Sequence, residues 1–279
     1  MIRSLSSPTP TPVRPELVEG PLCSSSATKR EKNAPSTSSG RTVVKLAMLL
    51  AAALALTTPA IAQQTVEQRL ASYRERVERL EDQLAIENLQ ADFGYYFDKG
   101  LWNEVAALFS RNGSFEYGMR GVYLGQDRIQ RALLLFGPQG LAPSHLNNHM
   151  QLQGVVIVAD DGRTATGRWQ GMVQLAEPNA NGMWGVGIYE NTYVKEGGTW
   201  KIASLHFYPT ALTDYNAGFM RSTIPMEGQS ALFPPDRPPT EVYRSLPGNY
   251  IPPFSFDHPV TGQSLQDLPQ PPDSVLGRK

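Results

Sequence analysis

The sequence predicts an α+β fold, a cone-shaped α+β barrel in which N-terminal helices pack on a curved antiparallel meander of four strands. Apolar residues recur at helical spacing between residues 66 and 136, and they alternate with a period of two between residues 146 and 210. Of the 23 prolines, seven precede residue 60, four lie between residues 138 and 209, and twelve follow from residue 225 onward. A proline-poor middle between proline-rich ends is typical of one folded domain with two non-globular ends.

The composition excludes several function classes. The 279 residues carry 25 Lys+Arg against 26 Asp+Glu, a net charge of −1. Nucleic-acid-binding proteins usually show a basic excess, so we expect no nucleic-acid partner. The single cysteine, Cys23, excludes a disulfide framework and a CxxC metal or redox site. No GxGxxG, Walker A or GxSxG motif occurs, and we expect no cofactor.

The N-terminal region has the features of a targeting segment. Positive charge at Arg41–Lys45 precedes an apolar run of 11 residues, Leu46–Leu56, and the small-residue site Ala60-Ile61-Ala62 follows. This order predicts a signal peptide at residues 41–62, cleaved after Ala62, and a periplasmic or secreted protein. The run is shorter than the roughly 20 residues that span a bilayer, so we expect no stable membrane anchor; a buried core helix is the alternative.

Residues 1–40 are rich in Ser, Pro and Thr. We expect them to be a non-native or disordered leader, with the true start nearer Val43, Val44 or Met48.

Residues 63–79 are predicted to form a helical extension of the domain. Apolar residues follow one another at alternating spacings of four and three: Val66, Leu70, Tyr73, Val77, Leu80 and Leu84. We call these six residues the α-seam. Such a spacing is typical of a coiled-coil seam, but it also fits an amphipathic helix packed on its own domain.

Four further elements precede the meander: a helix at Ile86–Phe97, a short helix at Leu101–Phe109, a strand at Ser114–Tyr117 and a helix at Gln126–Phe136. Lys99-Gly100 breaks the first helix, and Arg111-Asn112-Gly113 is predicted to end the second.

The meander then follows as four long strands at Leu146–Ala159, Arg163–Ala176, Met183–Lys195 and Thr199–Thr210. Asp-Gly and Gly-Gly turns join them, which favours antiparallel neighbours. Because the helices must cover one face of this curved sheet, we expect a pocket between the helices and the sheet.

Residues 213–279 form a Pro-rich C-terminal segment that also holds Phe233, Tyr243, Tyr250, Phe254 and Phe256. Disorder would not require these aromatic residues, so we predict an extended arm that packs on its own domain or on a neighbouring subunit.

Three stretches of the sequence resemble one known family. Residues Tyr95–Phe109, with Trp102 just after the helix break, Phe115–Tyr117 and Gly198–Ile202 look like the SnoaL-like branch of the nuclear-transport-factor-2-like superfamily. Its members include ketosteroid isomerase, scytalone dehydratase, hexachlorocyclohexane dehydrochlorinase and polyketide cyclases. The resemblance implies a SnoaL-like domain at residues 80–212, but it says little about chemistry because this fold hosts many functions.

The resemblance also implies a catalytic pair. In the dehydratase and dehydrochlorinase members, an Asp at the end of the first helix pairs with a His on the first long strand; Asp98 and His149 stand at these positions. His149 would be the general base and Asp98 would orient it, while Tyr117, at the position of a pocket Tyr, would donate a hydrogen bond to a developing negative charge. The alternatives are a helix-terminal role for Asp98 and a structural role for His149.

Two departures from the scytalone dehydratase pattern put dehydration of that substrate class in doubt. Phe97 stands where that family has a Tyr before the Asp. No second pocket His occurs on the second long strand, where we find Arg168, Gln170, Met172 and Gln174.

Five further residues are candidates for the substrate pocket: Tyr95, Phe97, Trp102, Glu190 and His206. Alternation along the last strand places His206 on one face with Trp200 and Ile202. Alternation alone does not say whether that face, or the face of the preceding strand that carries Glu190, looks inward. His145 and His149 lie four apart but on a loop and a strand, without a carboxylate cluster, so we expect no metal.

Together these observations predict an exported, cofactor-independent lyase or isomerase that acts on a small apolar or aromatic substrate by Asp–His acid/base chemistry. Dehydratase, dehydrochlorinase and deformylating lyase reactions all remain open. The alternative is a non-catalytic binding or assembly module of the same fold. We further expect a homodimer or homotrimer.

Overall fold

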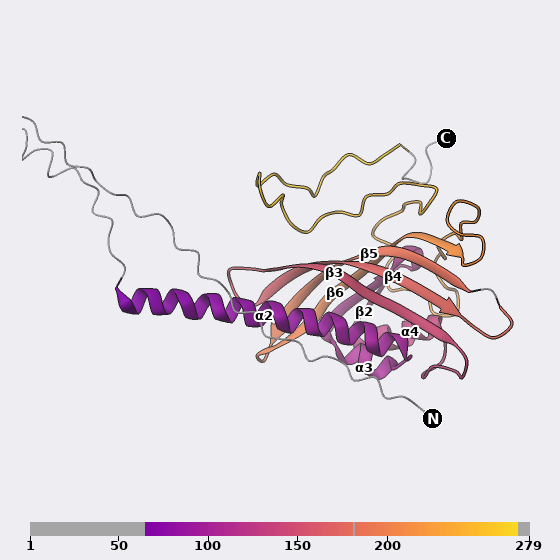
Figure 1. The fold of residues 1–279 in the computed structure, drawn as a ribbon. Coiled ribbons are helices and arrows are strands. Elements are labelled where there is room, and N and C mark those ends of the chain that lie inside the picture. Colours follow the sequence, from indigo (N-terminus) through magenta and orange to yellow (C-terminus); the bar gives the residue numbers. More distant parts are fainter. Residues whose placement is uncertain (1–64, 181, 273–279) are drawn as a thin grey trace, which may run out of the picture. The chain divides into compact units, whose positions relative to one another are not determined.

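The computed structural model describes residues 65–180 and 182–272. The predicted leader (1–40), the predicted signal peptide (41–62) and Cys23 lie outside the described residues. The elements, in chain order, are α2 (Val66–Asp98), α3 (Trp102–Ala107), β1 (Phe109–Tyr117), the 3-10 turn η1 (Gly118–Arg120), β2 (Val122–Leu124), α4 (Gln126–Leu133), the 3-10 turn η2 (Leu134–Phe136), β3 (Leu146–Val158), β4 (Thr164–Ala176), β5 (Met183–Glu196) and β6 (Thr199–Asp214) (Figure 1).

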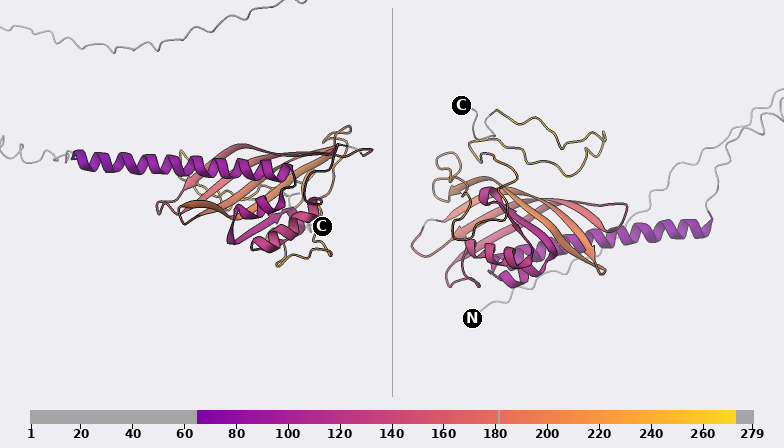
Figure 2. Two further views of the ribbon diagram at one scale, coloured as in Figure 1. Left: turned by 90° about the horizontal axis from the view of Figure 1, so that it is seen from below. Right: turned by 180° about the vertical axis from the view of Figure 1, so that it is seen from behind.

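One curved sheet of six strands in the order β2-β1-β6-β5-β4-β3 organises the domain. Strands β3 to β6 form the predicted antiparallel meander, and β1 joins it in parallel beside β6. Helix α2 packs along β3, and α3 and α4 pack together on the same side of the sheet (Figures 1 and 2). The predicted α+β architecture is therefore confirmed.

The sheet is larger than the predicted meander of four strands, because β1 and β2 extend it. The polar stretch Arg111-Asn112-Gly113 was expected to end a helix, yet it lies inside β1, where the register with β6 shifts between Phe109 and Ser114. Helix α3 consequently ends at Ala107, two residues before the predicted end at Phe109. Strand β2 has only three residues, too few to produce a periodic signal.

Helix α2 begins at a capping box, in which Thr65 and Gln68 satisfy each other's backbone N–H groups. Its two halves differ in environment. The C-terminal half buries Ile86, Phe93 and Phe97, whereas the α-seam of the N-terminal half is exposed, from 49% at Leu70 to 75% at Val66. The α-seam therefore does not pack on its own domain.

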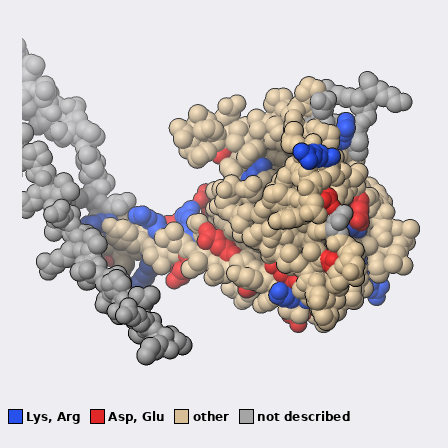
Figure 3. Space-filling model, turned by 45° about the vertical axis from the view of Figure 1, so that its right-hand side comes forward, with Lys and Arg blue, Asp and Glu red and all other residues tan. Residues whose placement is uncertain are grey.

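Charged residues of both signs alternate along the exposed part of α2, and the face in view carries no large area of one sign (Figure 3). None of the helices in the described part of the chain is long and apolar enough to cross a membrane.

The core lies between the helices and the concave, inner face of the sheet. Aromatic residues dominate it: Phe93, Phe97, Trp102, Phe109, Phe115, Tyr189, Tyr193, Trp200 and Phe207. Gly187 on β5 makes room for one of them, since a Cβ there would lie 2.4 Å from Cζ of Phe207. The Phe207 ring can therefore lie directly on the sheet.

Residues 215–272 contain no helix and no strand beyond one isolated bridge, at Arg237. Part of this segment covers the outer face of the sheet, where Tyr243 is fully buried and its ring lies 5.8 Å from that of Tyr208 on β6. Leu246 donates its backbone N–H to Thr210 of β6. The segment packs on its own domain, one of the two arrangements expected for the Pro-rich arm.

Candidate active site

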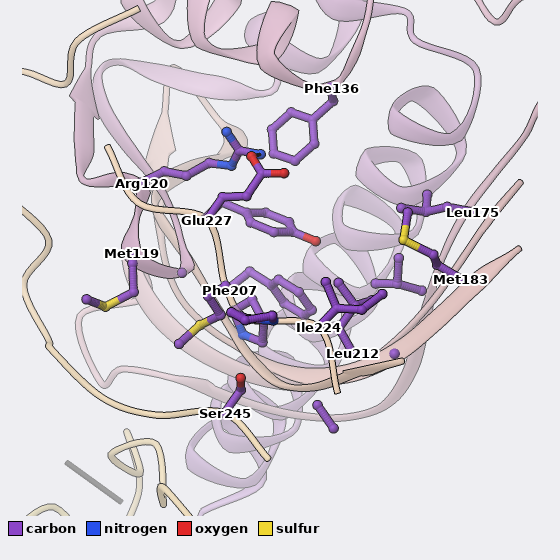
Figure 4. Close-up of a pocket in the computed structure, with 18 of the residues that line it drawn as sticks. Met119, Arg120, Phe136, Leu175, Met183, Phe207, Leu212, Ile224, Glu227 and Ser245 are labelled. Atoms are coloured by element: carbon purple, nitrogen blue, oxygen red, sulfur yellow. Dashed lines mark hydrogen bonds and ion pairs between the residues drawn. The ribbon is translucent and has the colours of Figure 1, made fainter. Parts of the chain in front are cut away.

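A cavity of about 320 Å³ opens between the inner face of the sheet, the turn after β1 and the segment that follows β6. Its volume lies within the range of small-molecule sites. Most of its walls are apolar; its lining includes Tyr117, Arg120, Phe136, His149, Val173, Leu175, Met183, Phe207, Leu212, Ile224, Met226 and Glu227 (Figure 4).

The structure brings Asp98, the last residue of α2, into contact with His149 on β3. Oδ1 of Asp98 accepts a hydrogen bond of 2.5 Å from the backbone N–H of His149 and lies 3.7 Å from Nδ1 of its ring. The second distance is longer than a hydrogen bond. Asp98 therefore holds the strand directly and faces the imidazole at close range.

His149 lies between two hollows. It lines the 320 Å³ cavity, and it also lines a smaller hollow of about 210 Å³ between α2 and β3, where Asp98 and Tyr95 lie. Asp98 does not line the larger cavity. The arrangement leaves the imidazole between the carboxylate and the cavity.

Close packing of α2 on β3 fixes this contact. Gly94 faces β3, where an added Cβ would lie 2.8 Å from Cγ of Gln151 and 3.3 Å from the carbonyl oxygen of His149. The side chain of Gln151 donates a hydrogen bond of 2.7 Å to that same carbonyl, and it accepts one from Gln90 on α2. Gly94 and the side-chain amides of Gln90 and Gln151 thus fix the position of His149 relative to helix α2.

Burial controls the ionisation of His149. Its side chain is 3% exposed, and burial lowers its pKa, while the neighbouring Asp98 carboxylate opposes this shift. The ring is therefore neutral at neutral pH, the state in which an imidazole accepts a proton.

Tyr117, at the end of β1, lines the same cavity as His149. Its ring lies 4.9 Å from that of Phe136 and 4.8 Å from that of Phe207. Burial raises the pKa of its hydroxyl, so the group stays protonated and can donate a hydrogen bond.

The other α2 and α3 candidates do not line this cavity. Tyr95 is 70% exposed and lines only the smaller hollow. Phe97 packs edge-to-face on His149, with ring centroids 4.5 Å apart, and so contacts the imidazole directly. Trp102 donates its indole N–H to the carbonyl of Gly137 and lines a neighbouring hollow.

Glu190 and His206 lie on the outer face of the sheet, away from the cavity. The predicted grouping of His206 with Trp200 and Ile202 is wrong, because a β-bulge intervenes: Thr192 pairs with Ser204 and Tyr193 with Ile202, which leaves one extra residue on β6. Beyond the bulge Leu205 and Phe207 point inward and His206 points outward.

The C-terminal segment encloses these outer groups. Glu190 forms an ion pair with Arg168, whose guanidinium also donates to the carbonyl of Pro253 and lies 3.8 Å above the ring of Phe254. Burial raises the pKa of Glu190 to about 7 even though Arg168 opposes the shift.

His206 has similar surroundings. Its Nδ1 lies 3.5 Å from Oε2 of Glu116, and its ring stacks on Tyr208 at 3.7 Å. Burial lowers its pKa. Glu116 in turn accepts hydrogen bonds from the backbone and the hydroxyl of Thr240 in the C-terminal segment.

Several lining residues were not among the predicted site residues. Phe136, Phe207 and Met183 belong to predicted elements, but periodicity does not distinguish a residue that lines a cavity from one that fills the core. Arg120 and Glu227 come from a turn and from the C-terminal segment, where no periodic pattern exists. No group of three or more His, Cys, Asp or Glu residues within the described ranges is placed to hold a metal ion.

Comparison with known proteins finds one family that matches part of the chain. Residues 78–206 match the SnoaL-like domain family. This stretch therefore resembles a SnoaL-like domain. No curated protein shows significant similarity to the chain.

Solved structures of similar fold cover about half of this chain. A putative scytalone dehydratase from Novosphingobium aromaticivorans is 22% identical, with 56% of this chain and 99% of that chain covered and a TM-score of 0.44. A hexachlorocyclohexane dehydrochlorinase of type 2 is 19% identical over 50% of this chain and 92% of its own, with a TM-score of 0.43. A protein of unknown function from Mycobacterium tuberculosis is 22% identical over 45% and 74%, with a TM-score of 0.38. None of these similarities assigns an activity.

Proposed function

We propose that this SnoaL-like domain is a cofactor-independent lyase or isomerase of the nuclear-transport-factor-2-like superfamily, with His149 as its general base. The observation that carries the proposal is a neutral, buried imidazole that lines an apolar cavity and has a carboxylate on its far side. Because Nδ1 faces Asp98, Nε2 is the nitrogen left to take a proton from a substrate. Asp98 is then a positioning residue that stabilises the imidazolium as it forms.

Tyr117 completes the proposed machinery. It lines the same cavity as His149 and carries a protonated hydroxyl. Proton abstraction beside a carbonyl or a leaving group builds negative charge on an oxygen or a halide, and the hydroxyl can donate a hydrogen bond to it. The apolar walls exclude water, which strengthens that hydrogen bond.

The test is a turnover screen with purified protein from residue 63 onward. The panel holds β-hydroxy ketones, chlorinated cyclohexanes and diaryl compounds with a hydroxymethyl side chain, one type for each reaction that remains open. Products are followed by mass spectrometry, and released formaldehyde is followed by colorimetry. Turnover that disappears in His149→Ala supports the proposal.

Turnover that His149→Ala retains at the wild-type rate contradicts the proposed base. Binding of panel compounds without any turnover favours the second candidate, a non-catalytic binding module. The observation behind that candidate is the 3.7 Å separation of Nδ1 and the Asp98 carboxylate, which is longer than the hydrogen bond of a typical dyad.

We also propose that the protein is exported and that it forms a homodimer or homotrimer. Sequencing of the mature N-terminus should start at Gln63, and a protein that retains residues 1–40 would contradict export. The exposed α-seam is the contact surface in this proposal, because six apolar residues at heptad spacing are the pattern of pairing helices. Light scattering should report an oligomer that Val77→Lys dissociates, whereas a wild-type monomer at micromolar concentration contradicts self-association.

A further inference from the structure

The cavity holds one permanent cation. Among the residues that line it, Arg120 alone carries a fixed positive charge. It is the last residue of η1, three positions beyond Tyr117 at the end of β1, and its side chain is 12% exposed. A guanidinium so far removed from water needs an anion beside it.

In this structure the anion is the chain's own carboxylate, Glu227. It comes from the segment after β6, and the two side chains point toward each other beside Phe136 (Figure 4). The two partners differ in exposure, since the Glu227 side chain is 73% exposed while that of Arg120 is not. Glu227 can therefore turn into water at little cost, but Arg120 cannot.

The surroundings of Arg120 connect it to the proposed chemistry. Its guanidinium lies 5.2 Å from the centre of the Phe136 ring, and that ring packs edge-to-face on Tyr117. An anionic group that took the place of Glu227 would lie beside this ring. The apolar remainder of the molecule would then extend along the walls formed by Phe207 and Leu175, toward His149.

The segment that carries Glu227 is held at the cavity by its own contacts. Ile224 donates its backbone N–H to the carbonyl of Leu212 on β6, and Thr213 donates its hydroxyl to the carbonyl of Ser222. Ile224, Pro225, Met226 and Glu227 all line the cavity. The backbone thus stays in place while the Glu227 side chain is free to exchange.

We propose that Arg120 is the substrate-recognition residue of this cavity and that its ligand is the carboxylate of an aromatic or alicyclic acid, for which Glu227 stands in when the site is empty. A guanidinium offers paired N–H donors in the geometry of a carboxylate, and Glu227 shows that a carboxylate fits here. The inference rests on the proposed function, because it assumes that the cavity is the substrate site.

The test compares two probes of the same shape that differ in charge, trans-cinnamate and trans-cinnamamide, by isothermal titration calorimetry at neutral pH. The wild type should bind cinnamate at least about tenfold more tightly than the amide. Arg120→Gln should remove this preference and leave the affinity for the amide unchanged. Glu227→Gln removes the internal competitor, so it should tighten cinnamate and not the amide.

Arg128→Gln is the matched control, because Arg128 forms its ion pair with Asp236 and does not line the cavity. It should keep the preference for cinnamate. Equal affinity for the two probes, failure of both to bind, or a preference that survives Arg120→Gln would overturn the inference. If Arg120→Gln does not fold, a Glu227→Gln protein with unchanged cinnamate affinity overturns it equally.

These outcomes are separate from those of the turnover screen. A neutral compound turned over by the wild type and not by His149→Ala would sustain the proposed function, whatever the calorimetry reports for Arg120. Tight binding of cinnamate with no turnover of any compound would sustain the Arg120 site and contradict the enzyme.

Discussion

The two faces of the sheet each bury a histidine beside a carboxylate. On the inner face, Nδ1 of His149 lies 3.7 Å from Asp98, and on the outer face Nδ1 of His206 lies 3.5 Å from Glu116. Burial lowers both histidine pKa values. By distance and burial the two pairs are similar.

The two histidines differ in their access to a cavity. His149 lines the 320 Å³ cavity, whereas His206 is stacked on Tyr208 and enclosed by the C-terminal segment. A buried histidine–carboxylate contact is therefore not by itself a sign of catalysis. The comparison teaches that the empty space beside the imidazole, and not its perturbed ionisation, distinguishes a candidate base from a structural residue.

The largest expected effect tests this distinction directly. His149→Ala should lower kcat/KM by roughly 10²–10⁴-fold, the loss that follows removal of a general base. His206→Ala, the matched outer-face change, should leave the rate near that of the wild type while lowering the free energy of unfolding. Steady-state kinetics and urea unfolding of both variants measure this. Comparable rate losses in the two would break the comparison.

A second pair of changes removes one hydroxyl from each side. Tyr117→Phe should reduce kcat by about 10²-fold if the hydroxyl stabilises developing charge. The control is Tyr243→Phe on the outer face, whose buried hydroxyl has no hydrogen-bond partner among the described residues. Its loss should leave activity unchanged and the free energy of unfolding equal or higher. Full activity in Tyr117→Phe would exclude the proposed donor.

Asp98→Asn sharpens the inner-face assignment through a pH profile. We expect kcat to fall by roughly 10- to 100-fold, because Asn no longer selects the required tautomer or stabilises the imidazolium. The Asp98 charge holds the pKa of His149 up against burial, so its removal lowers that pKa further. The acidic limb of kcat/KM should therefore move to lower pH. An acidic limb that does not move would contradict His149 as the titrating base.

A double variant tests whether the rate losses of Asp98→Asn and His149→Ala are additive. If the two residues act as a unit, the double variant with His149→Ala should be scarcely slower than His149→Ala alone. Losses that multiply would show that Asp98 acts independently of His149.

The smallest expected effect concerns the stability of the outer face. The pKa of Glu190 is raised from 4.5 to about 7, so the native state holds more protons than the unfolded chain between these values. Its contribution to stability is therefore complete below about pH 4.5 and is lost as the pH rises through about 7. Between about pH 5 and pH 8 the wild type should lose roughly 1–3 kcal/mol relative to Glu190→Gln.

Urea unfolding of both proteins at the two pH values measures this difference, and parallel pH dependence would contradict it. Turnover by Glu190→Gln should match the wild type, because Glu190 does not line the cavity.

Local patterns predicted the elements well where they are long. The four strands β3 to β6 begin within one residue of their predicted starts. Strand β6 runs on to Asp214, past its predicted end at Thr210, because pairing with β5 continues there. Strand β2 was missed since three residues carry no period. The predicted strand at Ser114–Tyr117 is shorter than β1, because the polar stretch before Ser114, where the register with β6 shifts, shows no alternation of apolar residues.

The candidate site was predicted in part. The family resemblance led to Asp98, His149 and Tyr117; the structure brings the first two into contact and places the last two on one cavity. Their catalytic roles stay predictions. Arg120 and Glu227 could not be paired from the sequence, because 107 positions separate them and neither lies in a periodic segment.

By itself the sequence determined the order of the helices and of the long strands, since apolar spacing decides which segments can bury a face. Only the tertiary structure decided which residues share that face. One extra residue on β6 between Ile202 and Ser204 reverses the side chains that follow it up to the next bulge, which sends His206 outward and Phe207 into the cavity. The tertiary structure also decided how the cavity closes, because the contact between η1 and the segment after β6 depends on packing between parts of the chain that no local pattern relates.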